Sequence, residues 1–143
     1  MEKYESSQKQ IRRSAETIYA VLADFNNFTP LVADRVEGWA VEGDECSFTV
    51  KGMKMGLRMV EKVPGELIKI EAADSSPVGF TLWVQLKETG RNADGGFIDA
   101  PDTRMRLVLH VEMNMMIKMM IGSKLQGGIE QMAEQIAKTF NAI

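Results

Sequence analysis

The residues of this 143-residue chain that could do chemistry are few, because it has one histidine, His110, and one cysteine, Cys46. Neither belongs to a cluster with the ligand spacing of a metal site. A general base must lie within reach of its substrate. His110 shares its alternating phase with Arg104, Arg106 and Glu112, opposite to the apolar positions, so we expect it to face solvent. The sequence predicts no metal site, no cofactor and no catalytic constellation.

The cysteine, the glycine pair and the remaining charged residues also give no indication of a catalytic site. Cys46 shares the phase of Phe48 and Val50, which indicates a small core residue and not a thiolate nucleophile. Gly95-Gly96 lacks the strand, lysine and helix of a phosphate-binding loop. No pair among the remaining acids and arginines has a spacing that indicates acid–base catalysis, and alternation places most of them on the outer face of the sheet. These residues are Arg58, Glu61, Glu71, Arg104 and Arg106.

Charge and composition exclude several classes of protein. The formal net charge is -3, from 17 basic and 20 acidic residues, and the longest basic cluster is Arg12-Arg13. Binding to nucleic acid needs clustered Lys and Arg, so we expect no nucleic-acid partner. No stretch reaches the ~20 apolar residues of a membrane span. The first ten residues lack a signal-peptide core, and a single cysteine fits a reducing compartment. We expect one cytoplasmic domain spanning residues 1–143.

The element that must organise any site is the segment Met113–Ile143. Gly122, Gly127 and Gly128 interrupt its pattern, each at a cost of ~1 kcal/mol relative to Ala. They indicate either a close approach or bend that opens a cavity mouth, or a break at which Ser123 and a residue three positions on form a capping box. Apolar residues at steps of three or four predict an amphipathic helix: Ile117, Ile121, Leu125, Ile129, Met132, Ile136, Phe140 and Ile143.

The rest of the chain reads mainly as short strands. A strand over 4–11 leads to Ser14, a helix N-cap, and to a helical face formed by Ile18, Val21, Leu22 and Phe25. A break with a second short helical piece follows near residue 30. We interpret 89–102 as a hairpin tip or an insertion near a cavity mouth. Alternation predicts six further strands over 36–41, 46–50, 53–59, 67–72, 80–87 and 104–113.

This order predicts an α+β fold: a seven-stranded, curved antiparallel sheet wrapped around the long C-terminal helix, with two short helices after the first strand. The opening Ser14–Phe25, the strand Asp44–Val50 and the run Glu112–Met120 resemble the START-like (SRPBCC) helix-grip superfamily. Birch-pollen allergens and the polyketide cyclase/dehydrase group share this fold. The resemblance implies a deep apolar cavity between sheet and helix, which holds lipids, sterols or polyketides in relatives.

We expect the chain to bind a small hydrophobic molecule there. Polyketide cyclase/hydrolase-like catalysis and a chaperone-activator-type interaction surface including Trp39 or Trp83 are the alternatives. Trp83 is out of phase with its apolar neighbours, so it forms either an exposed patch or a subunit contact, and a homodimer is left open. Eleven methionines favour an adaptable surface. The side chains expected to line the cavity are Phe48, Met55, Met59, Phe80, Leu82, Leu107, Leu109, Leu125, Ile129 and Met132. The alternative is that these residues form a filled core.

Overall fold

The structure is a computed structural model that describes residues 2–32, 34, 36–50, 52–73, 79–89, 102–112 and 115–142. Most of the predicted connection 89–102, at residues 90–101, lies outside the described residues. The strands are β1 (Glu2–Glu5), β2 (Lys9–Ile11), β3 (Glu37–Glu42), β4 (Glu45–Val50), β5 (Met53–Val63), β6 (Leu67–Ala72), β7 (Gly79–Glu88) and β8 (Thr103–Glu112). The helices are α1 (Ala15–Leu22), η1 (Phe25–Phe28), α2 (Thr29–Val32), α3 (Met115–Ile117), the π-helix η2 (Lys118–Gly122) and α4 (Ser123–Asn141).

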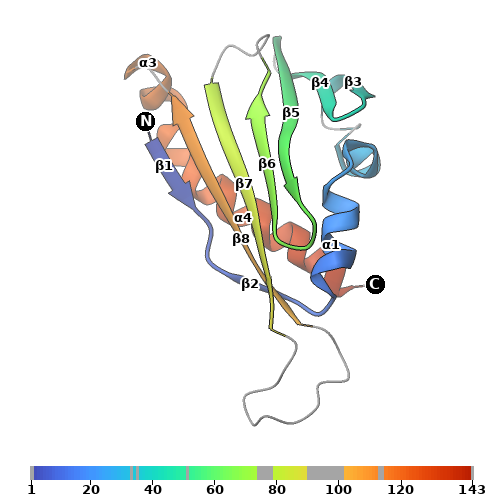
Figure 1. The fold of residues 1–143 in the computed structure, drawn as a ribbon. Coiled ribbons are helices and arrows are strands. Elements are labelled where there is room, and N and C mark those ends of the chain that lie inside the picture. Colours follow the sequence, from blue (N-terminus) through green and yellow to red (C-terminus); the bar gives the residue numbers. More distant parts are fainter. Residues whose placement is uncertain are drawn as a thin grey trace.

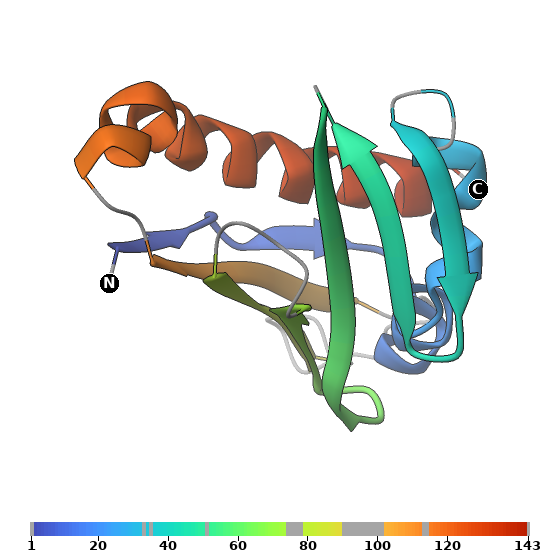
Figure 2. The same cartoon turned by 90° about the horizontal axis from the view of Figure 1, so that it is seen from above.

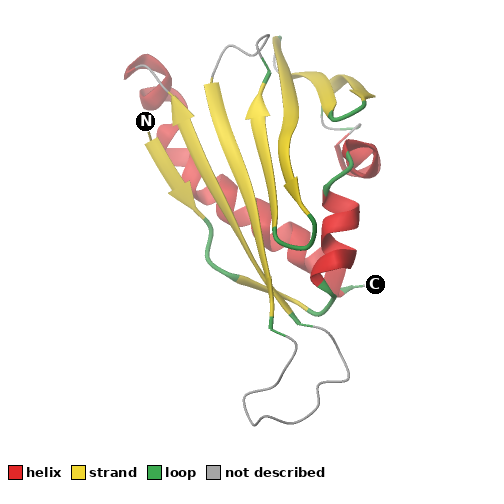
Figure 3. Cartoon of the chain, in the orientation of Figure 1, coloured by secondary structure: helices red, strands yellow, loops and turns green. Residues whose placement is uncertain are grey.

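The strands form one antiparallel sheet in the order β1-β8-β7-β6-β5-β4-β3, with β2 also paired to β8. All the helices lie on the same side of the strands (Figure 1, Figure 3). Seen from above, the sheet curves, so that β3, β4 and β5 rise beside α4 while β1 and β8 run beneath it (Figure 2). The predicted α+β class and the curved sheet around a C-terminal helix are confirmed. In the described part of the chain, no helix has both the length and the hydropathy needed to cross a membrane.

The first predicted strand, over 4–11, is divided in two, and the sheet therefore has eight strands where seven were predicted. The division falls at Ser6. Its backbone N–H donates to the Leu107 carbonyl at 2.9 Å, and its Oγ accepts from the Leu107 N–H at 2.9 Å. Because the serine hydroxyl satisfies a donor that a strand carbonyl would otherwise meet, the backbone can leave the ladder without an unpaired buried group.

Helix α1 begins at the predicted N-cap. The Ser14 Oγ accepts from the Thr17 N–H at 3.1 Å, and Glu88 of β7 accepts from the Ala15 N–H at 2.7 Å. The helix buries Ala15, Ile18 and Leu22 against β6 and β7. Val21 was predicted on this face, but 38% of it is exposed. The correction has a simple geometric reason, because Val21 lies on the margin of an apolar face centred on Ile18 and Leu22.

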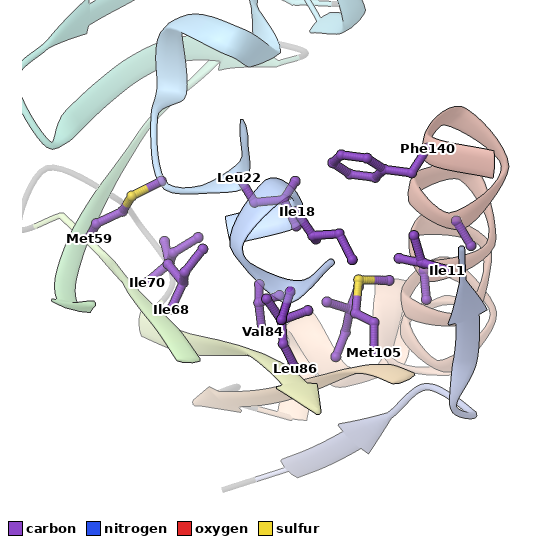
Figure 4. Packing of buried hydrophobic residues seen from close by; sticks show 14 of the residues in the cluster. Ile11, Ile18, Leu22, Met59, Ile68, Ile70, Val84, Leu86, Met105 and Phe140 are labelled. Carbon is purple, nitrogen blue, oxygen red and sulfur yellow. The ribbon is translucent and has the colours of Figure 1, made fainter. Parts of the chain in front are cut away.

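The core lies where α1 and the C-terminal half of α4 meet the sheet. Ile18 lies between Phe140 of α4 and Val84 of β7 (Figure 4). Cys46 is 4% exposed and has a free thiol, and burial raises its pKa to about 11. The prediction that Cys46 is a core residue is confirmed. Among the described residues, the large apolar side chains with no exposure are Ile11, Ile18, Ile68, Met105 and Leu107.

Side chains of α4 fix the helix to the N-terminal strands at three points along its length. Near the start, the Gln126 amide donates to the Glu5 carbonyl at 2.7 Å. At the end, the Asn141 amide oxygen accepts from the Arg12 N–H at 2.7 Å, and its nitrogen donates to the Gln10 carbonyl at 3.0 Å. These bonds satisfy backbone groups on the outer edge of β1 and β2, which no further strand covers. They set the lateral position of the helix.

The middle point is Glu130, one turn after Gln126. Its carboxylate accepts from the Ser7 N–H and the Ser7 Oγ, each at 2.8 Å, and it forms an ion pair with Lys9. Hydrogen bonds from Lys9 and then from Ser7 lower the pKa of Glu130 from 4.5 to about 2. The folded state therefore prefers the ionised carboxylate more strongly than the unfolded state does.

We predict that Glu130→Gln removes a contribution to stability that depends on pH. The folded pKa lies below the unfolded value, so the contribution is complete above pH 4.5 and is lost as the pH falls toward 2. Thermal unfolding should show the largest deficit of the variant near pH 6 and convergence with the wild type toward pH 2. Glu134→Gln, one turn further along the exposed face, is the control. A deficit for Glu130→Gln that stays constant from pH 6 to pH 2 would contradict the assignment.

Candidate functional site

The face of the sheet that points toward α4 is fully buried at one end of β8, half-buried at Leu109, and buried again at Val111, which is 4% exposed. At the covered end, β8 contributes Met105 and Leu107, both with 0% exposure. Two residues further along the same strand and face, Leu109 is only half-buried, and it pairs in register with half-buried Leu82. We call the half-buried part the open inner surface. It consists of Phe48, Met55, Phe80, Leu82, Leu109 and Leu125.

The ten candidate ligand-binding residues fall into groups. Phe48, Leu82 and Leu109 are half-buried and pack against the core, whereas Met55, Phe80 and Leu125 are half-buried and lie outside the core cluster. Met132 was expected to face the sheet, but it is 48% exposed at the margin of the helix stripe, whose buried positions include Ala133 and Ala137. Three candidates belong to the buried core: Met59, Leu107 and Ile129.

The open inner surface follows from the position of α4. The helix packs mainly against β1, β2 and β8, the strands to which its polar side chains are fixed, and α1 covers β6 and β7 at the other end. The polar contacts made by Gln126, Glu130 and Asn141 were not predicted, since no local pattern shows which distant backbone group a surface side chain meets.

The segment before α4 is helical but irregular. Lys118–Gly122 forms a π-turn, and Gly122 has helical dihedral angles, φ -54° and ψ -42°, with no side-chain cap. The predicted break with a capping box at Ser123 is therefore wrong, because the Gln126 amide bonds to β1 instead. A π-turn is a recognised cause of helix bending, and Figure 2 shows the ribbon changing direction there. The predicted bend is the correct alternative.

Methionines on this irregular segment project into solvent. Met115, Met116 and Met119 are 80%, 71% and 80% exposed, and Met53 at the start of β5 is 51% exposed. One cation of the segment, Lys118, pairs with Glu2 at 2.7 Å. Methionine side chains adapt their shape at low cost. The segment therefore presents a deformable apolar surface near the same end of the fold as the open inner surface.

The glycines within α4 do not serve a close approach to the sheet, as one interpretation predicted. A Cβ added to Gly127 or Gly128 would meet nothing within 4 Å outside the helix's own nearby backbone. Both residues are exposed. The helix therefore bears the conformational cost of two glycines without a packing gain, and its first two turns are intrinsically weak.

The remaining polar and aromatic candidates lie away from the open inner surface or are already engaged. Trp39 is half-buried, with its Nε1 donating to Thr29 at 2.8 Å and its ring 5.9 Å from that of Phe48, so it forms no exposed patch. His110 lies on the outer face, as its phase predicted, with its ring 4.5 Å from that of Trp83. Across the described ranges, no group of three or more His, Cys, Asp or Glu side chains is placed to hold a metal ion.

Solved structures with the same architecture span nearly the whole chain. Norcoclaurine synthase from Thalictrum flavum, in complex with dopamine and hydroxybenzaldehyde, has a TM-score of 0.65 at 15% identity, over 96% of this chain and 85% of that one. The Aha1 dimer from Colwellia psychrerythraea has a TM-score of 0.60 at 13% identity, over 99% and 94%. A Deinococcus radiodurans protein has a TM-score of 0.60 at 15% identity, over 99% and 95%.

These similarities show the fold. The chain has the helix-grip fold, as its sequence predicted. No protein-family profile and no curated protein sequence matches the chain. Because one fold hosts many unrelated activities, function has to be argued from the residues of the site itself.

We predict that two leucines on one strand and one face differ sharply in their contribution to stability. Leu107→Ala removes a fully buried side chain and should cost about 3–5 kcal/mol of unfolding free energy. Leu109→Ala should cost about 1–2 kcal/mol, because the space around this half-buried side chain is already incompletely filled. Urea unfolding of both variants tests this. Equal losses would mean that the inner surface is packed as tightly at Leu109 as at Leu107.

We also predict that Gly127→Ala and Gly128→Ala each raise the unfolding free energy by ~1 kcal/mol, because both positions are helical, exposed and free of steric contact. Urea unfolding measures the gain. Gly65→Ala is the opposing control, since its φ of 73° is unfavourable for any residue with a Cβ, and it should destabilise the protein. A loss of stability at either helical position would show a packing role for that glycine.

Proposed function

We propose that the protein binds a small hydrophobic molecule against the open inner surface, between the sheet and the first half of the C-terminal helix. The observation that carries this proposal is the local drop in burial along one face of β8, where Met105, Leu107 and Val111 are buried while Leu109 and its cross-strand partner Leu82 are only half-buried. Apolar surface in contact with water costs roughly 25 cal/mol per Å² relative to burial. A ligand that covers these side chains regains that energy.

The chemistry of the surface favours an apolar ligand of the lipid, sterol or polyketide class. Its six side chains are all aliphatic, aromatic or thioether, and sites of this kind bind mainly through shape and apolar contact. A further support comes from the fold. Norcoclaurine synthase, which has the same architecture, is in complex with two small aromatic molecules.

The irregular helical segment provides access to this site. α4 is fixed to β1 and β2 from Gln126 onward, while the exposed methionines Met115, Met116 and Met119 precede the first of these bonds. The π-turn and the glycines make this part of the helix the easiest to displace. Opening of the segment admits the ligand, and the methionines then adapt to its shape.

Native mass spectrometry of gently purified protein, with extraction of any co-purifying molecule, is the first experiment. The second measures the binding affinity of the apolar dye N-phenyl-1-naphthylamine. Leu109→Phe should reduce dye affinity at least about tenfold, equivalent to 1.4 kcal/mol, by filling the site. It should leave stability within about 1 kcal/mol of the wild type, since the added atoms occupy open space. Val60→Phe, at a 43% exposed position on β5, is the control and should leave binding unchanged.

The proposal fails if Leu109→Phe binds the dye as the wild type does. It also fails if that variant loses about 1–3 kcal/mol of stability, which is the usual cost of overpacking a filled core.

A second candidate function is a protein-interaction module. The specific observation in its favour is the exposure of Met115, Met116 and Met119, at 80%, 71% and 80%. Methionine-rich surfaces also serve promiscuous protein binding. Under this second function, substitution of all three by Gln would abolish binding of a protein partner, whereas Leu109→Phe would leave that binding intact. The enzyme alternative requires a titratable group at the open inner surface, whose six residues are all apolar.

Two accompanying predictions belong to this proposal. A cytoplasmic location is supported by the free thiol of Cys46, which suits a reducing compartment. A homodimer is supported only by the Aha1 structure, which is a dimer.

A further inference from the structure

The outer face of the sheet, opposite α4, carries a groove of about 340 Å³ that belongs neither to the core nor to the open inner surface. Its floor is Val108 of β8. Along β8, Arg106 lies at one end and His110 at the other, each roughly 7 Å from Val108 because alternate residues share a face. Across the strands, Val108 pairs in register with Trp83 of β7 on one side and with Glu5 of β1 on the other.

The end formed by Arg106 lacks a partner. The Nε of Arg106 is buried and makes no hydrogen bond within the described residues, and none of their ion pairs includes this guanidinium. By contrast, Arg104 on the same face pairs with Asp102 at 3.5 Å. Arg106 as a residue is half-buried and lines the groove, so an acceptor supplied by a ligand would satisfy a donor that has none within the described residues. The natural acceptor for a guanidinium fork is a carboxylate or a phosphate.

The backbone explains why this arginine is left unpaired. β1 ends at Glu5, opposite Val108, and β2 begins at Lys9, opposite Met105. Arg106 therefore lies beside the interruption at residues 6–8, where no strand residue stands opposite it on that side.

The wall formed by Trp83 is held in place. The His110 ring meets it edge-on, with centroids 4.5 Å apart, and the Lys69 ammonium lies 5.7 Å from the Trp83 ring centroid. A fixed indole beside an apolar valine floor favours the ring of an aromatic ligand. Glu5 lies level with Trp83 and not with Arg106, so its carboxylate repels an anionic group from the centre of the groove toward the arginine end.

We propose that this outer groove binds a small aromatic carboxylate, with the carboxylate on Arg106 and the ring between Trp83 and Val108. This ligand class differs from the apolar ligand of the inner surface in two respects, because it needs a negative charge and it contacts the opposite face of the sheet. The two sites are therefore independent, and occupation of one neither requires nor prevents occupation of the other.

The test is a titration with benzoate, followed in two-dimensional ¹H–¹⁵N spectra through the Trp83 indole and Arg106 Nε–H signals. Benzoate should shift both signals in a saturable way, whereas benzamide, a neutral isostere, should not. Arg106→Gln should weaken binding at least about tenfold by removing the charged fork. Arg104→Gln, the matched control on the same strand and face, should leave the affinity unchanged. The spectrum of each variant also reports whether it is folded.

Several results would overturn the proposal. One is equal binding of benzamide in the wild type, which needs no variant. Another is undiminished benzoate binding by folded Arg106→Gln. A third is inorganic phosphate shifting both signals at the same concentrations as benzoate, which would remove the role of the ring. Benzoate shifts at the Leu109 and Leu82 methyl groups, without change at Trp83, would assign the ligand to the inner surface instead.

Discussion

The lateral attachment of the C-terminal helix to the first two strands is the constraint on which the rest of the structure depends. Gln126, Glu130 and Asn141 bind backbone groups of β1, β2 and the turn between them. These strands form one edge of the sheet, so the helix is held over that edge and not over the centre. Since edge strands carry unpaired backbone groups, the same bonds also protect β1 and β2 from pairing with another chain.

From this position the helix can complete only part of the core. Its C-terminal half, with Ala133, Ala137 and Phe140 buried, closes the end of the fold that α1 also covers. Its first half covers a sheet that has curved away from it (Figure 2). The half-buried residues of the inner face and the exposed methionines lie on this side, and the glycines fall at the beginning of the same helix. The position of the helix therefore accounts both for the tightly packed core under its C-terminal half and for the half-buried inner surface near its first half.

The periodic elements were predictable because each depends on local pattern. The strands over 67–72 and 80–87 and the N-cap at Ser14 follow from alternation and capping chemistry, and they match the structure closely. Whole-chain resemblance then supplied the helix-grip topology. The division at Ser6 was missed, since it depends on a hydroxyl that meets Leu107 about a hundred residues away in the sequence.

The site was less predictable than the fold for the same physical reason. Alternation correctly assigned Leu107 and Leu109 to one face, but only three-dimensional packing distinguishes the buried residue from the half-buried one. The glycines of α4 suggested close packing, and the structure places open space beside Gly127 and Gly128. On the outer face, the phase of Arg106 predicted exposure, whereas its Nε is buried and has no hydrogen-bond partner among the described residues.

The central claim is that a hydrophobic ligand occupies the open inner surface and not the closed core. Methionines on both sides of that boundary allow a direct measurement by ¹³C-methyl NMR, using intermolecular nuclear Overhauser effects to bound N-phenyl-1-naphthylamine. The account predicts contacts from the dye to Met55, which is half-buried, and none to Met105, which has no exposure. A saturably bound dye that makes no contact with Met55 or with the Leu82 and Leu109 methyl groups would contradict it.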